Sequence, residues 1–319
     1  MGKYIIKRVA QAFVVMFLVT LISYALIQIM PGDAAVIYLG SDAANEELLA
    51  RTRAEMNLDK PFVVQWVLWL ANFVRGDFGK SFHFHVPVRD LIMERLDITF
   101  TLGFFALMLS VVVGIILGIT AATHRNGLWD NLINVFANVG ISAPSFWISL
   151  LCIYIFALHF RILPVQGYVP PKKDLGEAVR HMILPCFIMA LPSIATMTRQ
   201  TRASILDVLN EDYVRTARSK GLKKNVILYK HVLKNALIPV LTVLGMSIAS
   251  LFGGSVMVEQ IFNIPGMGQL VTNAVLNRDI PIIQAFIVII SLVIILSALL
   301  VDIAYGIVDP RIRIAKGEN

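Results

Sequence analysis

The sequence predicts an all-α membrane protein, and three observations lead to this fold class. Of the 319 residues, 57% are hydrophobic and only 15% are charged, whereas a soluble domain carries about 25% charged residues. The mean hydropathy of the chain is +0.74. Six segments are apolar over most of the roughly 20 residues that a membrane-spanning helix requires, namely Val9–Met30, Ile98–Ala122, Leu132–Leu158, Met182–Met197, Leu237–Val258 and Ile280–Ile307.

The first and fourth segments need separate justification. Val9–Met30 follows a basic N-terminus, as a signal peptide would, but its apolar run of about 22 residues exceeds the roughly 7–15 of a signal sequence. We therefore expect an uncleaved first span. Met182–Met197 is the shortest segment, with about 16 residues, and it contains Pro185 and Pro192.

Basic residues beside the spans predict the orientation of the chain. Six spans place both termini on one side of the membrane, and cytoplasmic loops are enriched in Lys and Arg. The basic residues that flank the spans fall on that same side: Lys3, Lys7, Arg8, His124, Arg125, Arg199, Arg202, Arg311, Arg313, Lys316 and those of residues 213–235. We expect cytoplasmic termini, and we attribute the net charge of +7 to topology rather than to binding of nucleic acid.

The segment between spans one and two, Pro31–Asp97, is expected on the outer side. Its stretch SDAANEELLARTRAEMNL predicts a soluble helix, with Ser41 or Asp42 as N-cap and Asn57 at its end. The following stretch, PFVVQWVLWLANFV, predicts a helix with one aromatic face, made of Phe62, Trp66, Trp69 and Phe73. Such a face is typical of a helix at the membrane interface.

The spans themselves contain almost no ionisable residues. Proton relays, ion-coupled transporters and intramembrane enzymes keep such residues at membrane depth because their chemistry requires them. The pattern therefore argues against proton coupling and against hydrolysis within the membrane. Gly114 and Gly118 form a small-xxx-small pair that favours close helix packing, and Pro144, Pro192 and Pro239 favour kinks or helix ends.

Motifs that suggest ligand binding are incomplete. Gly79-Lys80-Ser81 matches the end of a phosphate-binding loop, but Val74 occupies the position of its first glycine. His83 and His85 have no nearby Cys or further His to complete a metal site. PGMG, at 265–268, lacks the third glycine of a dinucleotide fingerprint and reads as a turn. We expect no catalytic residue, and no metal or cofactor bound by this chain.

The loop after span four is strongly basic. Residues 213–235, YVRTARSKGLKKNVILYKHVLKN, contain seven Lys or Arg and no acidic residue. We expect a short helix from Tyr213 to Lys220, with Asn210 as its N-cap and Gly221 in the left-handed conformation that ends it. A second helix is expected from Lys223 towards Pro239, and its apolar stripe is predicted to contain Val226, Ile227, Leu233 and Leu237.

These two helices joined at Gly221 have three equally supported roles on charge alone. They are a lever that projects from the membrane bundle, a loop that sets topology, and a patch for anionic lipid headgroups. The order of residues favours the lever. ARSKGL, nine further residues to His231 and then VLKNALIP resemble the "EAA" loop of ABC importer permeases. Ala217, Gly221 and Leu233 match that pattern. The departures are similar to the version found in the dipeptide, oligopeptide and nickel branch: Arg215 and Thr216 replace Glu and Ala, His231 replaces Ile and Lys234 replaces Pro.

Other motifs resemble the first permease subunit of that branch along nearly the whole chain. They are YIIKRV, PGD at 31–33, LDKP at 58–61, GDFGKS, VEQIFNIPGMGQLVTNAVLNRDIP and VDPRIR. The resemblance implies a type I importer permease fold, with residues 95–306 as the shared core, 1–94 as an added span and external segment, and 307–319 as a cytoplasmic tail. It also assigns an ATPase-coupling role to Tyr213, Arg215, Thr216, Ala217, Arg218, Lys220, Gly221 and His231.

The implied function is that of a non-enzymatic permease subunit in a prokaryotic cell membrane. The implied partners are a second homologous permease subunit, two ATP-hydrolysing subunits, an extracytoplasmic solute-binding protein and membrane lipid. Di- or oligopeptides are the expected cargo, and nickel, a metal chelate or glutathione is the alternative. Met246, Ser247 and Ser250 are pathway candidates because of their polarity or flexibility.

Two other classes of protein make different demands on the sequence. A membrane-embedded enzyme or a protein-anchoring scaffold would need charged or nucleophile–base pairs at membrane depth. An ion channel would need a ring of polar or charged pore residues. Neither pattern is visible in the sequence.

Overall fold

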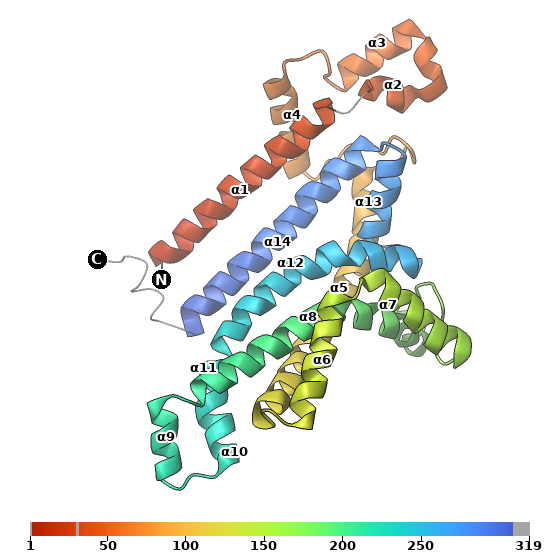
Figure 1. Ribbon diagram of the computed structural model, residues 1–319. Coiled ribbons are helices and arrows are strands. Elements are labelled where there is room, and N and C mark those ends of the chain that lie inside the picture. The colour runs from red at the N-terminus through yellow and green to blue at the C-terminus, as the bar shows by residue number, and fades with distance from the viewer. Residues whose placement is uncertain (1, 30–31, 309–319) are drawn as a thin grey trace. The chain divides into compact units, whose positions relative to one another are not determined.

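The computed structural model describes residues 2–29 and 32–308. Within them, five helices are long and apolar enough to cross a membrane (Figure 1): α1 (Gly2–Ile29), α5 (Val88–Thr123), α8 (Leu175–Val208), α12 (Ile238–Ile261) and α14 (Ile280–Val308). A bent pair of helices raises the number of spans to six if it counts as one. The predicted all-α membrane fold is confirmed. The predicted tail is described only to Val308, so Arg311, Arg313 and Lys316 lie outside the described residues.

The third predicted span, Leu132–Leu158, is not one continuous helix. α6 (Leu128–Ser142) and α7 (Ser145–Cys152), which continues as the π-helical stretch Ile153–His159, meet at an angle of 111°. Ala143 is extended, with φ −77° and ψ 133°, and Pro144 follows it. The α conformation is disfavoured before proline because the ring clashes with the preceding residue. The predicted span is therefore a bent pair of helices, and the break lies at Pro144, where the sequence indicated a kink or a helix end.

The fourth span is much longer than its apolar stretch. α8 has 34 residues and contains both Pro185 and Pro192. Proline removes one backbone hydrogen bond, but neighbouring helices make this tolerable in membrane helices. The longer helices bring charged residues into their length: Arg199 and Arg202 belong to α8, Asp130 to α6 and Glu259 to α12. The prediction that the spans contain almost no ionisable residues followed from spans drawn too short.

The described chain forms two compact units, residues 9–29 and 32–99 with 265–295, and residues 2–8 with 100–264 and 296–308. The first contains α2 (Ala34–Leu39), the 3₁₀ turn Gly40–Ala44, α3 (Glu46–Glu55), α4 (Phe62–Val74) and α13 (Met267–Leu276). The N-cap of α3 is Asn45, whose side chain accepts hydrogen bonds from Glu47 N and Leu48 N. The prediction of Ser41 or Asp42 as the N-cap was therefore wrong. Asn57, with φ 56°, follows the helix end as predicted.

The aromatic face of α4 packs against α1. Trp66 meets Phe17 edge to face with ring centroids 5.2 Å apart, and Tyr24 lies between Phe62 and Trp69. The buried Gln65 accepts hydrogen bonds from Tyr24 Oη and Gln28 Nε2, both at 3.0 Å. Three of the four aromatic residues therefore contact a neighbouring helix, and Phe73 stacks on Phe78. The large hydrophobic side chains that α4 leaves exposed are Val63, Val64, Val67, Leu68 and Val74.

The GKS motif forms a structural turn. Gly79 has φ +81°, which favours glycine, and the Ser81 hydroxyl donates a hydrogen bond to the fully buried carboxylate of Asp279. The backbone N–H of His83 donates to the same oxygen at 3.1 Å. His85 instead packs its ring against Tyr38. This turn therefore anchors the segment after α4 to the residue that precedes α14.

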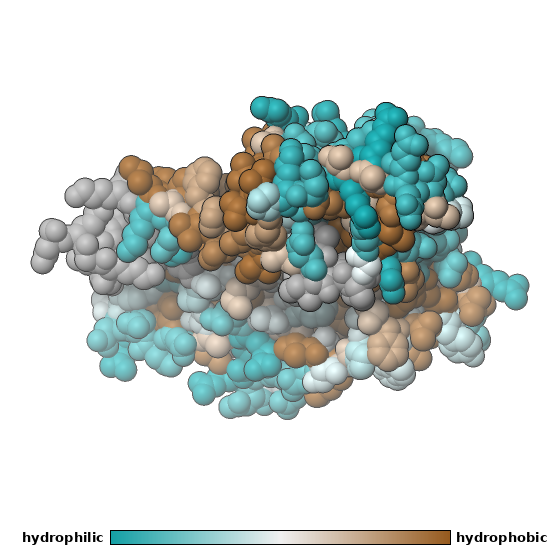
Figure 2. All heavy atoms as spheres, turned by 90° about the horizontal axis from the view of Figure 1, so that it is seen from above, coloured by the Kyte–Doolittle hydropathy of each residue, from teal (hydrophilic) through white to brown (hydrophobic). Residues whose placement is uncertain are grey.

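Close helix packing occurs where the small-xxx-small pair predicts it. A Cβ built on Gly114 would lie 2.7 Å from Met197 Cβ, and one on Gly118 would lie 2.5 Å from Thr201 Cβ. Distances this short mean that α5 and α8 touch at both glycines. Figure 2 shows hydrophobic patches in brown among hydrophilic residues in teal on the face that it draws. The exposed large hydrophobic side chains of α14 include Leu292, Leu296 and Leu300. An apolar surface of this kind suits a lipid solvent.

Candidate functional site

The basic loop between α8 and α12, residues 210–237, is named the elbow here. Its first arm is α9 (Asp212–Ser219) and its second arm contains α10 (Lys224–Val226), a π-helical stretch (Ile227–Val232) and α11 (Leu233–Ala236). In Figure 1, α9 and α10 form a short hairpin beyond the ends of α8 and α11. The two-armed shape agrees with the sequence expectation.

The start of α9 differs from the prediction. Its N-cap is Glu211, whose side chain makes no capping bond. Asn210 is not the cap, because its amide donates to Leu206 O at 3.1 Å and so belongs to the end of α8. Asp212 lies in the first turn, where a negative charge suits the helix dipole. Only Val214 and Ala217 of α9 are buried, so the helix lies on the protein along one narrow apolar stripe.

Gly221 ends the first arm in the left-handed conformation, as predicted. Its φ is +75°, and its N–H donates to Arg218 O at 2.9 Å. No other atom lies within 4 Å of where its Cβ would be. The conformation of the backbone, and not a shortage of space, is therefore what makes this position favour glycine.

The apolar stripe of the second arm is shifted from the prediction. Its buried residues are Ile227, Leu228, Val232 and Ala236, whereas Val226 is 40% exposed. π-helical turns close with i→i+5 hydrogen bonds, so Val232 follows Ile227 after five residues instead of four. A stripe drawn with a regular α-helical period places Val226 inside and leaves Leu228 out.

One hydrophobic cluster holds both arms against the helix ends. It joins Val214 and Ala217 of α9 and the buried residues of the second arm to Ala122 of α5 and Ile205 of α8, with Ile119, Leu206, Val208, Leu209 and Leu233 packed around it. Each fully buried Val, Leu or Ile side chain contributes about 1.5–3 kcal/mol. The arms are also tied to each other, because Asn235 Nδ2 donates to Tyr213 Oη at 2.8 Å. The elbow is therefore fixed to α5 and α8.

The predicted coupling residues mostly lie on the outer surface of the elbow. Arg215, Thr216, Arg218, Lys220 and Gly221 are exposed, and Tyr213 is 40% exposed. Two of the predicted residues serve the inner surface instead: Ala217 is buried, and the half-buried His231 offers its carbonyl oxygen to Tyr213 Oη at 3.5 Å. The ion pair between Arg215 and Asp212, 3.8 Å apart and exposed, contributes little to stability. The outer surface thus presents free positive charge.

A buried ion pair between α6 and α8 is a feature that the sequence reading missed. The Arg202 Nε and Nη2 atoms donate to the two carboxylate oxygens of Asp130 at 2.6 and 2.8 Å. Asn126 N and Asn134 Nδ2 complete the carboxylate's partners, both at 2.9 Å. Asp130 is 2% exposed and Arg202 is 25% exposed. The two residues are 72 positions apart, and no local motif joins them.

The pathway candidates on α12 divide between two faces. Met246 and Ser250 are exposed, and so are Gly253, Gly254 and Met257 further along the same face. Ser247 is buried, and its hydroxyl donates to the carbonyl oxygen of Val243 at 2.8 Å. The open face combines the small residues Ser250, Gly253 and Gly254 with the flexible side chains of Met246 and Met257, unlike the exposed leucines of α14. In the part of the chain that the structure describes, no group of three or more His, Cys, Asp or Glu residues is arranged to hold a metal ion.

Two family models match most of the chain. Residues 114–314 match the family described as "Binding-protein-dependent transport system inner membrane component", and residues 1–103 match the N-terminal domain of such membrane components.

Three relatives are similar over nearly their full length. The chain is 43% identical over 313 residues to a probable peptide ABC transporter permease protein, y4tP, of Sinorhizobium fredii, covering 98% of this chain and 100% of that protein. A putative peptide transport system permease protein of Brucella abortus is 41% identical, with coverages of 98% and 99%. The oligopeptide transport system permease protein AppB of Bacillus subtilis is 37% identical, with coverages of 98% and 100%. With its membrane-length helices, the chain belongs to the inner membrane components of binding-protein-dependent transport systems.

Proposed function

We propose that this chain is a permease subunit of an ATP-driven importer of di- or oligopeptides, and that the elbow is its point of contact with the ATPase. It forms the pathway together with a second, homologous permease subunit, and two ATPase subunits supply the energy. A solute-binding protein delivers the cargo from outside. The names of the relatives support peptide as the cargo. The observation that carries the coupling role is the elbow itself, with its basic outer surface and its inner surface packed on α5 and α8.

The orientation that this function requires agrees with the distribution of charge. The elbow contains seven Lys or Arg between residues 213 and 235, and positive loops face the cytoplasm. With the elbow in the cytoplasm, α9 meets the compartment that contains ATP. The N-terminus, with Lys7 and Arg8, is then cytoplasmic if α6 and α7 together make one span.

The packing of the elbow supports a mechanical role. α9 is about 12 Å long at 1.5 Å per residue, so a groove in a partner can enclose its whole length. Packed interiors have low compressibility, and a displacement of α9 therefore reaches the ends of α5 and α8 through Val214 and Ala217. ATP-driven approach of the two ATPases would then rock the helices as a body between outward- and inward-facing states.

We assign the open face of α12 to the pathway. Met246 and Ser250 lie on this face, whereas Ser247 satisfies its hydroxyl on its own helix. A face that combines small residues with flexible methionine side chains suits contact with varied peptides, since flexible surfaces adapt to different ligands. Ser247 therefore acts in helix packing, and only Met246 and Ser250 remain as pathway residues.

Charge reversal on α9 tests the coupling role. The variant Arg215→Glu with Arg218→Glu changes two exposed side chains and leaves the buried stripe intact. Lys172→Glu with Lys173→Glu is the matched control, because these lysines are also exposed but lie outside the elbow. We expect the α9 variant to lose co-purification with the ATPases and ATP-dependent uptake in vesicles, and the control to keep both. Equal behaviour of the two variants, or uptake by the chain alone without an ATPase, would refute the proposal.

The cargo is tested separately. The solute-binding protein that co-purifies with the transporter is analysed for bound small molecules by mass spectrometry. We expect short peptides. Nickel, a metal chelate or glutathione as the bound species would contradict the peptide part of the proposal while leaving the coupling role standing.

A further inference from the structure

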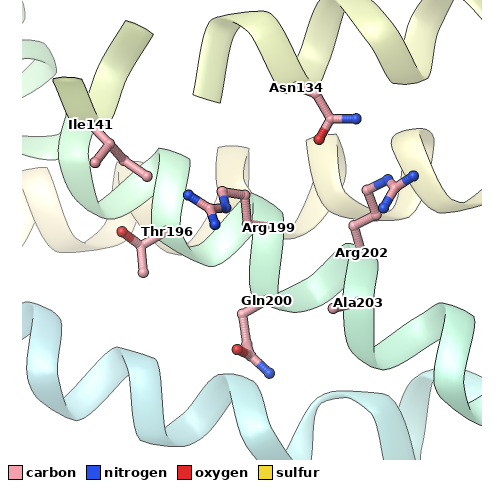
Figure 3. A pocket seen from close by; sticks show the side chains of 7 residues that line it. All are labelled: Asn134, Ile141, Thr196, Arg199, Gln200, Arg202 and Ala203. Atoms are coloured by element: carbon pink, nitrogen blue, oxygen red, sulfur yellow. The ribbon is translucent and has the colours of Figure 1, made fainter. Parts of the chain in front are cut away.

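A polar pocket of about 540 Å³ lies between α6 and α8 (Figure 3). Asn134 and Ile141 of α6 line one side, and the other side is lined by Thr196, Arg199, Gln200, Arg202 and Ala203 of α8. Pockets of roughly 300–1,000 Å³ are typical for small ligands. The volume therefore suits part of a short peptide or a single charged headgroup.

The pocket presents one uncompensated positive charge. Arg202 is neutralised by Asp130 through two hydrogen bonds. Arg199 is exposed, and the structure gives it no hydrogen bond or ion pair among the described residues. An exposed guanidinium that has no partner within the chain is available to pair with an anion from outside it. The free guanidinium of Arg199 thus favours an anion, and its fork of donors matches a carboxylate in two-point contact.

The remaining polar groups of the pocket can accept hydrogen bonds. Asn134 Nδ2 donates to the backbone oxygen of Asp130 at 2.8 Å and to its carboxylate at 2.9 Å. Both partners are acceptors only, so the amide nitrogen must face them and the Asn134 oxygen stays free. The Thr196 hydroxyl donates to Pro192 O at 2.9 Å and keeps lone pairs free. One cation beside free acceptors matches a carboxylate that carries a neighbouring N–H.

The open face of α8 differs from a surface suited to lipid. Its exposed residues in this region are spaced four, three, four and four positions apart along one stripe: Pro192, Thr196, Arg199, Ala203 and Asp207. None of these side chains is a large aliphatic one, whereas α14 exposes Leu292, Leu296 and Leu300. The stripe therefore faces an aqueous space or a protein partner, and the pocket opens onto it.

We propose that this pocket binds the C-terminal carboxylate of a peptide in transit, with Arg199 pairing the carboxylate and Asn134 and Thr196 accepting the terminal peptide N–H groups. The inference rests on the proposed peptide-transport function and adds a binding site for one end of the cargo. It predicts that a free C-terminus is recognised by the membrane subunit itself, separately from any recognition by the solute-binding protein.

Cysteine protection tests the site without requiring transport. Ala203→Cys places a thiol in the pocket without removing a polar group, and Asp207→Cys places one on the same helix outside the pocket. The native Cys152 and Cys186 are buried. The complete transporter, without its solute-binding protein, is placed in phosphatidylcholine nanodiscs, and the rate of maleimide alkylation is measured with trialanine or with trialanine amide.

We expect trialanine to slow alkylation of Ala203→Cys several-fold, trialanine amide to have little effect, and Asp207→Cys to react at the same rate throughout. Adding Arg199→Gln should raise the trialanine concentration needed for half protection about tenfold or more, because a charge-assisted hydrogen bond is lost. Arg199→Lys should restore part of the protection. Retained association with the partner subunits shows that each variant is folded.

Three results would overturn the proposal. The first is no protection by trialanine up to about 10 mM, and the second is equal protection by the amide. The third is slower alkylation of Ala203→Cys in nanodiscs that contain phosphatidylglycerol and no peptide, if this slowing disappears with Arg199→Gln. That result would assign the pocket to lipid headgroups. Peptide uptake is measured in parallel with the solute-binding protein present. Protection without uptake would count against the proposed transport function and not against the site.

Discussion

Replacing Arg202 with alanine would leave the Asp130 carboxylate buried between α6 and α8 with no cation beside it. The carboxylate would lose its bonds from Arg202 Nε and Nη2 and would keep those from Asn126 N and Asn134 Nδ2. Removing one partner of a buried ion pair costs about 3–5 kcal/mol. Because two hydrogen bonds remain, we expect the lower end of that range, about 3 kcal/mol of unfolding free energy.

Removing the carboxylate instead of the guanidinium should lower the unfolding free energy by less. Asp130→Ala leaves the charge on Arg202, which is 25% exposed against 2% for Asp130, so water can solvate the remaining ion. We expect about 2 kcal/mol. The double variant removes both charges, and its cost should fall below the sum of the single costs by about 1–3 kcal/mol, as is usual for directly bonded partners.

Unfolding in mixed detergent and sodium dodecyl sulfate, followed by fluorescence of the four tryptophans, measures these differences. Arg180→Ala is the matched control: Arg180 pairs with Glu177 at 2.7 Å, but both side chains are about half exposed. Its cost should stay below about 1 kcal/mol. The reasoning fails if Arg202→Ala costs no more than Arg180→Ala, or if the double variant costs the full sum of its parts.

Three further predictions concern glycine positions and the turn before α14. Gly221→Val should reduce ATP-dependent uptake and lower the unfolding free energy by about 1–2 kcal/mol, because a side chain is strained at φ +75°. Gly221→Asn should keep most of the uptake. Equal uptake by the two variants would contradict the role of the elbow as a lever. Gly118→Ala should lower the unfolding free energy by about 1–3 kcal/mol, because the added methyl group overpacks against α8. Gly103→Ala is its control: outside its chain neighbours and its own helix backbone, no atom lies within 4 Å of the added Cβ, so the same unfolding assay should show no measurable loss. Asp279→Ala should increase protease cleavage near Ser81, and unchanged cleavage would show that the turn does not depend on this carboxylate.

The sequence predicted faces of helices better than it predicted their partners. Phe62, Trp66, Trp69 and Phe73 share one side of α4 as predicted. The first three pack against α1 and Phe73 stacks on Phe78, because periodicity groups residues on one face and does not show what covers it. The cap of α3 was misplaced because the five residues Gly40–Ala44 form a 3₁₀ turn, which shifts the cap to Asn45. Several Ser, Asp and Asn candidates stand in that stretch, and local propensity alone does not separate them.

In the candidate site too, features set by neighbouring residues were predictable from the sequence, and contacts between distant segments were not. Gly221 was predictable because its conformation depends on the chain next to it. The prediction that Val226 belongs to the buried stripe was wrong, because the π-helical stretch that follows it changes the helical period. No residue type in that stretch indicates the change. The ion pair of Asp130 and Arg202 required α6 and α8 to be placed side by side, and the bend at Pro144 changes where α6 runs.

The same contacts define the body that the elbow would move. Val214 and Ala217 tie α9 to the ends of α5 and α8. Gly114 and Gly118 then hold α5 against α8 too closely for the helices to slide without a clash. Asp130 and Arg202 add α6 to this pair. A push on α9 therefore moves α5, α6 and α8 together, and it carries the pocket at Arg199 with them, so the affinity of that pocket for a carboxylate need not change as the body rocks. What changes is which side of the membrane can reach it, and the ATP-driven cycle of the proposed ATPase partners would set the direction of release.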